Sequence, residues 1–208
     1  MASPSTLTDY SEVLKKNKIV GRNVLAFTID DFLSKQECQE LIDLTEKKGY
    51  ETALLNVGNG KQILSSHRQS DRCIIDDSDM AKHFFKKVKD FLPQEINGYK
   101  VLGLNERMRF LRYDKGDYFK PHLDGNYVRD ATEKSMVTFF LFLNEEFSGG
   151  ACTFVHYDDE TKNVPCPAKT GRLLVFEHRI YHEGSLLVEG RKYAVRSDVM
   201  YKKKKTFF

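Results

Sequence analysis

The chain has 208 residues, with 33 Lys plus Arg against 30 Asp plus Glu and a formal net charge of +3 at pH 7. Hydrophobic residues make up 40% and charged residues 30%, which is the composition of a soluble globular protein long enough to bury a core. The scattered, nearly balanced charges exclude no fold but predict no nucleic-acid partner. The sequence contains no run of about 18 apolar residues, so it predicts no membrane span.

The ends of the chain and its cysteines bear on the compartment. Residues 1–10 have neither the basic nor the apolar region of a secretory signal. The cysteines are far apart and lack CxxC spacing, so we expect reduced, mostly buried thiols at Cys38, Cys73, Cys152 and Cys166. We therefore expect a cytoplasmic protein, with a nuclear location as the alternative.

The first half of the chain predicts a strand followed by two helices. Residues 23–30 alternate toward apolar and predict a strand, and Ser34 to Glu37 form a capping box that opens a helix ending at Gly49. The Asn59-Gly60 pair predicts a hairpin turn over 56–61, which would close over a substrate. A second helix is expected from Ser78 or Asp79 to Leu92, stopped by Pro93.

From Asn105 onward the pattern becomes one strand after another, separated by Gly-rich turns. The expected strands cover 108–113, 119–123, 136–143, 152–156, 173–176 and 193–201. Early helices followed by many strands predict an α+β fold, in which N-terminal helices buttress a jelly roll, the double-stranded β-helix. The run Lys202 to Lys205 is expected to be a solvated end.

The most informative motif is His122-Leu123-Asp124. In an extended strand, residues i and i+2 project from the same face, so an imidazole and a carboxylate can hold one metal ion together with a later histidine, His182. Two histidines and one carboxylate, with the rest of the metal open, are the ligand set of non-haem Fe(II) oxygenases. A second copy, His156-Tyr157-Asp158, runs into an acidic turn and is the weaker candidate.

Several ordered blocks around this motif resemble the 2-oxoglutarate and Fe(II)-dependent oxygenases of the prolyl 4-hydroxylase type. The blocks are LRYDKGDYFKPHLD (111–124), FLN (142–144), GGACTF (149–154), GRLLVF (171–176), HEG (182–184) and GRKYA (190–194). The resemblance runs from about Phe27 to Tyr201. It predicts a 1–20 extension, one oxygenase domain over 21–201 with a helical part (about 21–100) and a jelly-roll core (about 101–201), and a basic tail at 202–208.

The resemblance also implies a function and a site. It implies hydroxylation of an unactivated C–H bond, most simply on a peptidyl proline, with release of succinate and CO2 and with ascorbate as an optional reductant. The implied iron ligands are His122, Asp124 and His182, and Lys192 is the implied partner of the distal carboxylate of 2-oxoglutarate. The other implied cosubstrate contacts are Tyr113, Cys152 and Arg196, where Arg196 shares a strand face with Lys192 and is the alternative anchor.

Some positions depart from the family pattern. Cys152 stands where a threonine is frequent, Phe119 where some members have a tyrosine, Ser135 where an arginine positions peptide, and Asp198 where a tryptophan is frequent. Iron and cosubstrate are therefore better supported than a prolyl substrate. A free amino acid, another side chain or another small molecule remains open, as does a catalytically silent metal-binding scaffold. The oligomeric state is not indicated.

Three further residues carry alternative interpretations. His178 also follows the expected strand 173–176 and competes with His182 as a ligand. Arg68 and Arg72 are candidates for substrate contact at the mouth of the site, although surface ion pairing is the more common role for such residues.

Overall fold

The computed structural model describes residues 6–22, 24–56 and 62–204. Within these ranges the chain forms two antiparallel sheets, two short strand pairs and three α-helices, which confirms the α+β fold with a jelly-roll core. None of the helices in these ranges is long and apolar enough to cross a lipid bilayer.

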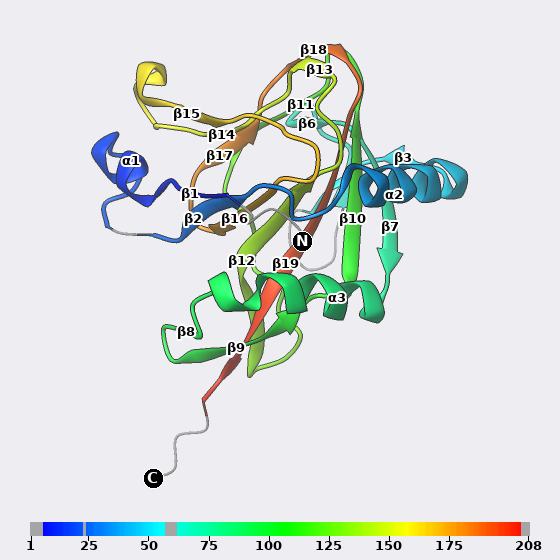
Figure 1. Cartoon of the computed structure of the whole chain (residues 1–208). Helices are drawn as coiled ribbons and strands as arrows, with labels where there is room; N and C mark the ends of the chain where they lie inside the picture. The colour runs from blue at the N-terminus through cyan, green and yellow to red at the C-terminus, as the bar shows by residue number, and fades with distance from the viewer. Residues whose placement is uncertain (1–5, 23, 57–61, 205–208) are drawn as a thin grey trace.

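The larger sheet has the long strands β12 (Glu133–Phe142) and β19 (Lys192–Lys203) at its centre, side by side in Figure 1. Its strand order is β1 (Leu7–Asp9), β2 (Ala26–Ile29), β16 (Leu173–Glu177), β12 (Glu133–Phe142), β19 (Lys192–Lys203), β10 (Arg107–Tyr113), β7 (Asp71–Asp76) and β3 (Glu51–Thr52). The far end of β19 also pairs with β9 (Tyr99–Leu104), which pairs in turn with β8 (Glu95–Ile96).

The smaller sheet lies over one face of the larger one. Its order is β15 (Val164–Cys166), β14 (Cys152–Phe154), β17 (His182–Gly184), β11 (Tyr118–His122) and β6 (Arg68–Gln69). Two short pairs complete the strands: β13 (Phe147–Gly149) with β18 (Leu187–Gly190), and β4 (Leu55–Asn56) with β5 (Gln62–Ile63). The turn expected at Asn59-Gly60 lies outside the described residues.

The helices come from the first half of the sequence, and the second and third of them cover one face of the larger sheet (Figure 1). They are α1 (Ser11–Lys16), α2 (Lys35–Lys48) and α3 (Ser78–Val88), with 3-10 turns at Lys89–Phe91 and Glu160–Lys162. The capping box is confirmed: Ser34 Oγ accepts from the Glu37 amide, and the Glu37 carboxylate accepts from the Ser34 amide. The second helix is shorter than expected, because its last turn tightens to a 3-10 turn before Pro93.

Two separate cores lie on the two faces of the larger sheet. One core, between the sheet and helices α2 and α3, contains Phe84 stacked on Phe139 at a centroid distance of 5.7 Å. The other, between the two sheets, contains Phe142, Phe154 and Phe176. Because β12 is covered on both faces beyond its first residues, its sequence from Met136 onward is almost continuously apolar rather than alternating. The candidate site lies at the second core.

Candidate metal centre and its pocket

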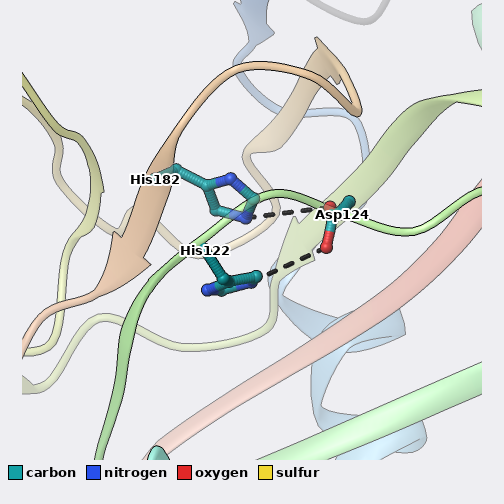
Figure 2. Close-up of side chains that lie close together, drawn as sticks. All are labelled: His122, Asp124 and His182. Carbon is teal, nitrogen blue, oxygen red and sulfur yellow. Dashed lines mark ion pairs between the residues drawn. The ribbon is translucent and has the colours of Figure 1, made fainter. Parts of the chain in front are cut away.

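Three side chains with metal-ligating atoms meet where β11 and β17 pair. His122 ends β11 and lies opposite His182, the first residue of β17, so the antiparallel register brings together histidines that are far apart in sequence. His122 Nε2 lies 3.6 Å from Asp124 Oδ1, and His182 Nε2 lies 3.7 Å from Asp124 Oδ2. Figure 2 shows both rings turned toward the carboxylate, and the three ligand atoms lie within 4.8 Å of one another.

Both imidazoles are held in the same tautomer. His122 Nδ1 lies 2.8 Å from the carbonyl of Lys120, and His182 Nδ1 lies 2.8 Å from the carbonyl of Ile180. A carbonyl only accepts, so each Nδ1 carries a proton and donates it. Each Nε2 therefore keeps its lone pair on the side of Asp124, where a metal would bind. Burial lowers the pKa of His182 to about 4, which keeps this ring neutral at physiological pH.

The carboxylate of Asp124 is fixed at both oxygens. Oδ2 accepts a hydrogen bond from Thr138 Oγ1 at 2.5 Å, and Oδ1 lies 3.1 Å from Arg196 Nη2. Burial alone would raise the pKa of Asp124, but the charge of Arg196 outweighs burial and the pKa lies well below its usual range. Asp124 is thus an anionic ligand in a defined orientation.

A pocket that is partly open to solvent extends from this triad into the space between the sheets. Its walls combine the triad with four cationic side chains and several aromatic ones. The lining residues are Arg68, Arg109, Leu111, Tyr113, Phe119, His122, Asp124, Thr138, Phe140, Cys152, Phe176, His182, Glu183, Gly184, Lys192 and Arg196. A concave site in which charged groups converge between aromatic walls is typical of small-molecule binding.

Lys192 is the most deeply buried cation of this pocket. Its side chain is 2% exposed, and Nζ donates to the carbonyl of Gly150 at 2.6 Å and lies 5.0 Å from the centre of the Tyr113 ring. Burial lowers the pKa of Lys192 from 10.5 to about 8. Among the described residues no carboxylate lies within ion-pair distance of this ammonium, so its environment suits the carboxylate of a ligand.

The other predicted cosubstrate residues line the same pocket. Tyr113 lies opposite Lys192 in the β10–β19 register and is buried. Burial raises the pKa of the Cys152 thiol, so this side chain is a neutral thiol rather than a thiolate. Arg196 differs from Lys192 because it is already paired, with both Asp124 and Asp198 at 3.1 Å.

The alternative metal ligands lie apart from the triad. His178 is buried and hydrogen-bonds to Thr138 and Ser135 instead of facing the space between the three ligand atoms. In the second His-x-Asp copy, the Asp158 amide donates to His156 Nδ1, and the part of the chain that the structure describes gives this pair no third metal-ligating partner.

Sequence reasoning missed some residues of the pocket. For Arg68 and Arg72, surface ion pairing was favoured over substrate contact at the mouth of the site. Arg68 instead lines the pocket, whereas Arg72 does form an ion pair with Glu51. Thr138 and Arg109 were not singled out. The signal for Arg109 was present, because Arg109, Leu111 and Tyr113 alternate along β10 and share one face. Thr138 lies within an apolar run that gives no hint of a polar partner.

The residues fit a divalent first-row metal and a dicarboxylate. Two neutral imidazoles and one carboxylate would hold the metal on one side and leave its other positions open toward the pocket. Lys192, at the buried end, would pair with one carboxylate of the ligand.

Comparisons with known proteins agree with this chemistry. Residues 108–197 match the family model described as the 2OG-Fe(II) oxygenase superfamily. The chain is 26% identical over 156 residues to probable prolyl 4-hydroxylase 8 of Arabidopsis thaliana, covering 71% of this chain and 51% of the relative. It is 28% identical over 165 residues to prolyl 4-hydroxylase 2 of the same plant, covering 74% and 50%. The chain thus spans about half the length of these curated relatives.

Solved structures share the fold. A viral collagen prolyl hydroxylase from Paramecium bursaria Chlorella virus-1, in complex with 2-oxoglutarate, superposes with a TM-score of 0.57 at 22% identity, covering 84% of this chain and 95% of the other. A Trichoplax adhaerens prolyl hydroxylase, in complex with a hypoxia inducible factor peptide fragment, superposes with a TM-score of 0.62 at 17% identity, covering 91% and 87%.

Proposed function

Because residues 108–197 match the model of the 2OG-Fe(II) oxygenase superfamily, we propose that the chain is an Fe(II)- and 2-oxoglutarate-dependent dioxygenase that hydroxylates an unactivated C–H bond. The observation that carries this proposal is the placement of His122, Asp124, His182 and Lys192 in one pocket. Bound Fe(II) would supply the activation of dioxygen, with 2-oxoglutarate as the two-electron donor that leaves as succinate and CO2.

The chain's own residues would bind the metal and the cosubstrate, orient them and shield them from water. His122, Asp124 and His182 would hold the metal through atoms whose protonation is already suitable. Lys192 would pair with the distal carboxylate of the cosubstrate, and the rings of Tyr113, Phe140 and Phe142 around Nζ exclude water from that end. Arg196 acts on the metal carboxylate, so we assign it to orienting Asp124 rather than to anchoring the cosubstrate.

The proposed substrate is a prolyl residue in a peptide or protein, by analogy with the prolyl 4-hydroxylases that the chain is similar to. Two residues that depart from the family pattern are occupied by contacts within the protein. Ser135 hydrogen-bonds to His178, and Asp198 forms ion pairs with Arg109 and Arg196. Neither side chain is free to hold a peptide. A free amino acid or another small molecule is therefore the second candidate.

The test is turnover of 2-oxoglutarate. Purified protein with Fe(II), 2-oxoglutarate and a proline-containing peptide library is expected to release succinate and to add one oxygen atom to some members, as read by mass spectrometry. His122→Ala is expected to abolish both signals, whereas His156→Ala, in the other His-x-Asp copy, is expected to retain them. Ascorbate is expected to prolong the reaction without being required for its first turnovers.

Two results would contradict parts of the proposal. If the protein binds the metal but releases no succinate with any substrate tested, the result would support a catalytically silent metal-binding scaffold. Succinate release with free amino acids but with none of the peptides would move the substrate to the second candidate.

A further inference from the structure

Arg68 is a partly buried cation with no ion-pair partner among the described residues. It projects from β6 into the pocket, its guanidinium lies over the ring of Phe119 at 4.9 Å, and Nε donates to Ser70 Oγ at 2.8 Å. Nη2 is buried and has no hydrogen-bond partner among the described residues, where no carboxylate forms an ion pair with this side chain. A guanidinium nitrogen that is buried without an acceptor is costly in a folded protein.

Two more guanidinium groups line the same pocket but are neutralised only in part. Arg109 pairs with Asp198 at 3.0 Å, and Arg196 pairs with Asp198 and Asp124 at 3.1 Å each. Nε of Arg196 is buried and, within the described part of the chain, has no partner. Burial lowers the pKa of Arg68, the nearby charges of Arg196 and Arg72 lower it as well, and the raising effects of Tyr113 and Asp124 do not reverse the shift.

A count of charges shows that the proposed metal and cosubstrate do not remove this imbalance. The cations of the pocket are Arg68, Arg109, Lys192 and Arg196, and the carboxylates are Asp124 and Glu183 on the wall and Asp198 behind it. One positive charge is left over. Fe(II) brings two positive charges and 2-oxoglutarate brings two negative ones, so the surplus is unchanged whichever cations hold the cosubstrate.

We propose that the substrate of this site presents a carboxylate to Arg68 when it binds, and that this charge determines which substrates are accepted. The inference rests on the proposed function, because the substrate must share the pocket with the metal centre. The planar guanidinium has the fork geometry that matches a carboxylate, and Nη2 and Arg196 Nε are donors that lack acceptors. The carboxylate belongs to an acidic residue beside the reacting one, to a peptide C-terminus or to a free amino acid.

Matched acid and amide ligands test the proposal by equilibrium binding. The protein, loaded with Fe(II) and 2-oxoglutarate under nitrogen, cannot turn over, so dissociation constants can be measured by calorimetry. The pairs are acetyl-Gly-Pro-Asp-Gly-amide with its Asn counterpart, acetyl-Gly-Pro with its C-terminal amide, and L-proline with L-prolinamide. At least one acid is expected to bind about tenfold more tightly than its amide, and the pair that does so identifies the source of the carboxylate.

Variants of Arg68 separate charge recognition from folding. Arg68→Gln is expected to remove the preference for the acid while leaving the dissociation constant of the amide within twofold, and Arg68→Lys is expected to retain part of the preference. Arg107→Gln is the matched control, because Arg107 pairs with the exposed Asp76 and does not line the pocket. It should keep the full preference.

A minimal probe covers the case in which none of these ligands binds. Acetate is expected to raise the thermal midpoint of the loaded protein more than acetamide, and Arg68→Gln is expected to abolish the difference. The ligand-free Arg68→Gln protein is expected to be at least as stable as the wild type. Equal effects of acetate and acetamide, or a large loss of stability in Arg68→Gln, would overturn the proposal. A missing succinate signal beside a clear acetate effect would instead contradict only the proposed function.

Discussion

Thr138 Oγ1 lies 2.5 Å from Asp124 Oδ2 and 2.9 Å from His178 Nδ1. A carboxylate only accepts, so the hydroxyl gives its single proton to Asp124, and Nδ1 of His178 must donate to the hydroxyl. His178 Nε2 then accepts from Ser135 Oγ at 2.8 Å. Burial lowers the pKa of His178, which favours this singly protonated ring. The hydrogen bonds therefore run in one direction, from Ser135 to the metal carboxylate.

Thr138→Val is expected to weaken metal binding by roughly 10- to 100-fold, because the isosteric methyl group removes the donor that orients Asp124. The measurement is a titration of the metal-free protein with Fe(II) under nitrogen. Thr138→Ser keeps the hydroxyl and is expected to bind the metal within about threefold of the wild type. Equal affinities for the valine and serine variants would show that Arg196 alone is sufficient to orient the carboxylate.

Lys192 makes the stability of the ligand-free protein depend on pH above neutrality. Its pKa is lowered from 10.5 to about 8 by burial, so between these values the unfolded chain binds more protons than the folded one. Stability is therefore expected to rise with pH across this window, by about 3 kcal/mol for this residue alone. Urea unfolding at pH 7.5 and pH 10 measures the change.

Lys192→Met removes the titrating ammonium. The difference between this variant and the wild type therefore gives the contribution of Lys192 to the pH dependence of stability, apart from other groups that titrate in the same range. The variant is expected to be more stable than the wild type at pH 7.5 and to lose its advantage at pH 10. Lys35→Met, at an exposed position at the start of α2, serves as the control and should follow the wild type at both pH values. A parallel pH response of wild type and Lys192→Met would contradict the burial argument.

Binding of 2-oxoglutarate is expected to show the opposite pH dependence, because the cosubstrate needs the protonated ammonium. Above a pH of about 8, its affinity should fall toward tenfold per pH unit, while below that value it should be nearly constant. Calorimetry under nitrogen gives the dissociation constants. Lys192→Arg keeps a charge that does not titrate here, so any binding it retains should be independent of pH in this range.

The parts of the fold that the sequence predicted are those with strong local signals. The Ser34 to Glu37 capping box predicted the start of α2, and the apolar run from Met136 predicted β12. β7 was missed because its charged residues hide the strand pattern. Those charges are neutralised across the sheet, where Asp71 pairs with Arg112 and Asp76 with Arg107. A partner that lies far away in sequence cannot be inferred from β7 alone.

Pro93 correctly indicated that the second helix stops, but the predicted end of the helix was one turn too late. Pro93 was expected to stop the helix after Leu92. The residue before a proline avoids the helical region, and Leu92 is extended, with φ −91° and ψ 143°. The preceding turn, Lys89–Phe91, is 3-10, so the α-helix ends at Val88. The stop signal therefore acts on the whole last turn.

The site residues that residue type and spacing identify were predictable from the sequence. Those whose position depends on tertiary burial were not. Spacing placed Lys192 and Arg196 on one strand face, and both line the pocket. The charge of Arg68 predicted a surface position, but pairing of β6 with β11 buries it beside Phe119. No local pattern carries that information, because Tyr118 and Phe119 reach β6 only through the tertiary register.

Gly171 joins the helical layer to the larger sheet, and its replacement is expected to destabilise the whole fold. Its φ is +76°, and a Cβ at this position would lie 2.0 Å from the carbonyl oxygen of Leu33, while its own carbonyl accepts from the amides of Phe32 and Leu33. Gly171→Ala therefore combines a left-handed backbone with a backbone clash, and we expect a loss of roughly 2–5 kcal/mol in urea unfolding. Gly103→Ala, on β9, is the control, because no atom lies within 4 Å of the added methyl group. It is expected to change stability by less than about 1 kcal/mol, and similar losses for the two variants would show that the Leu33 contact yields without cost.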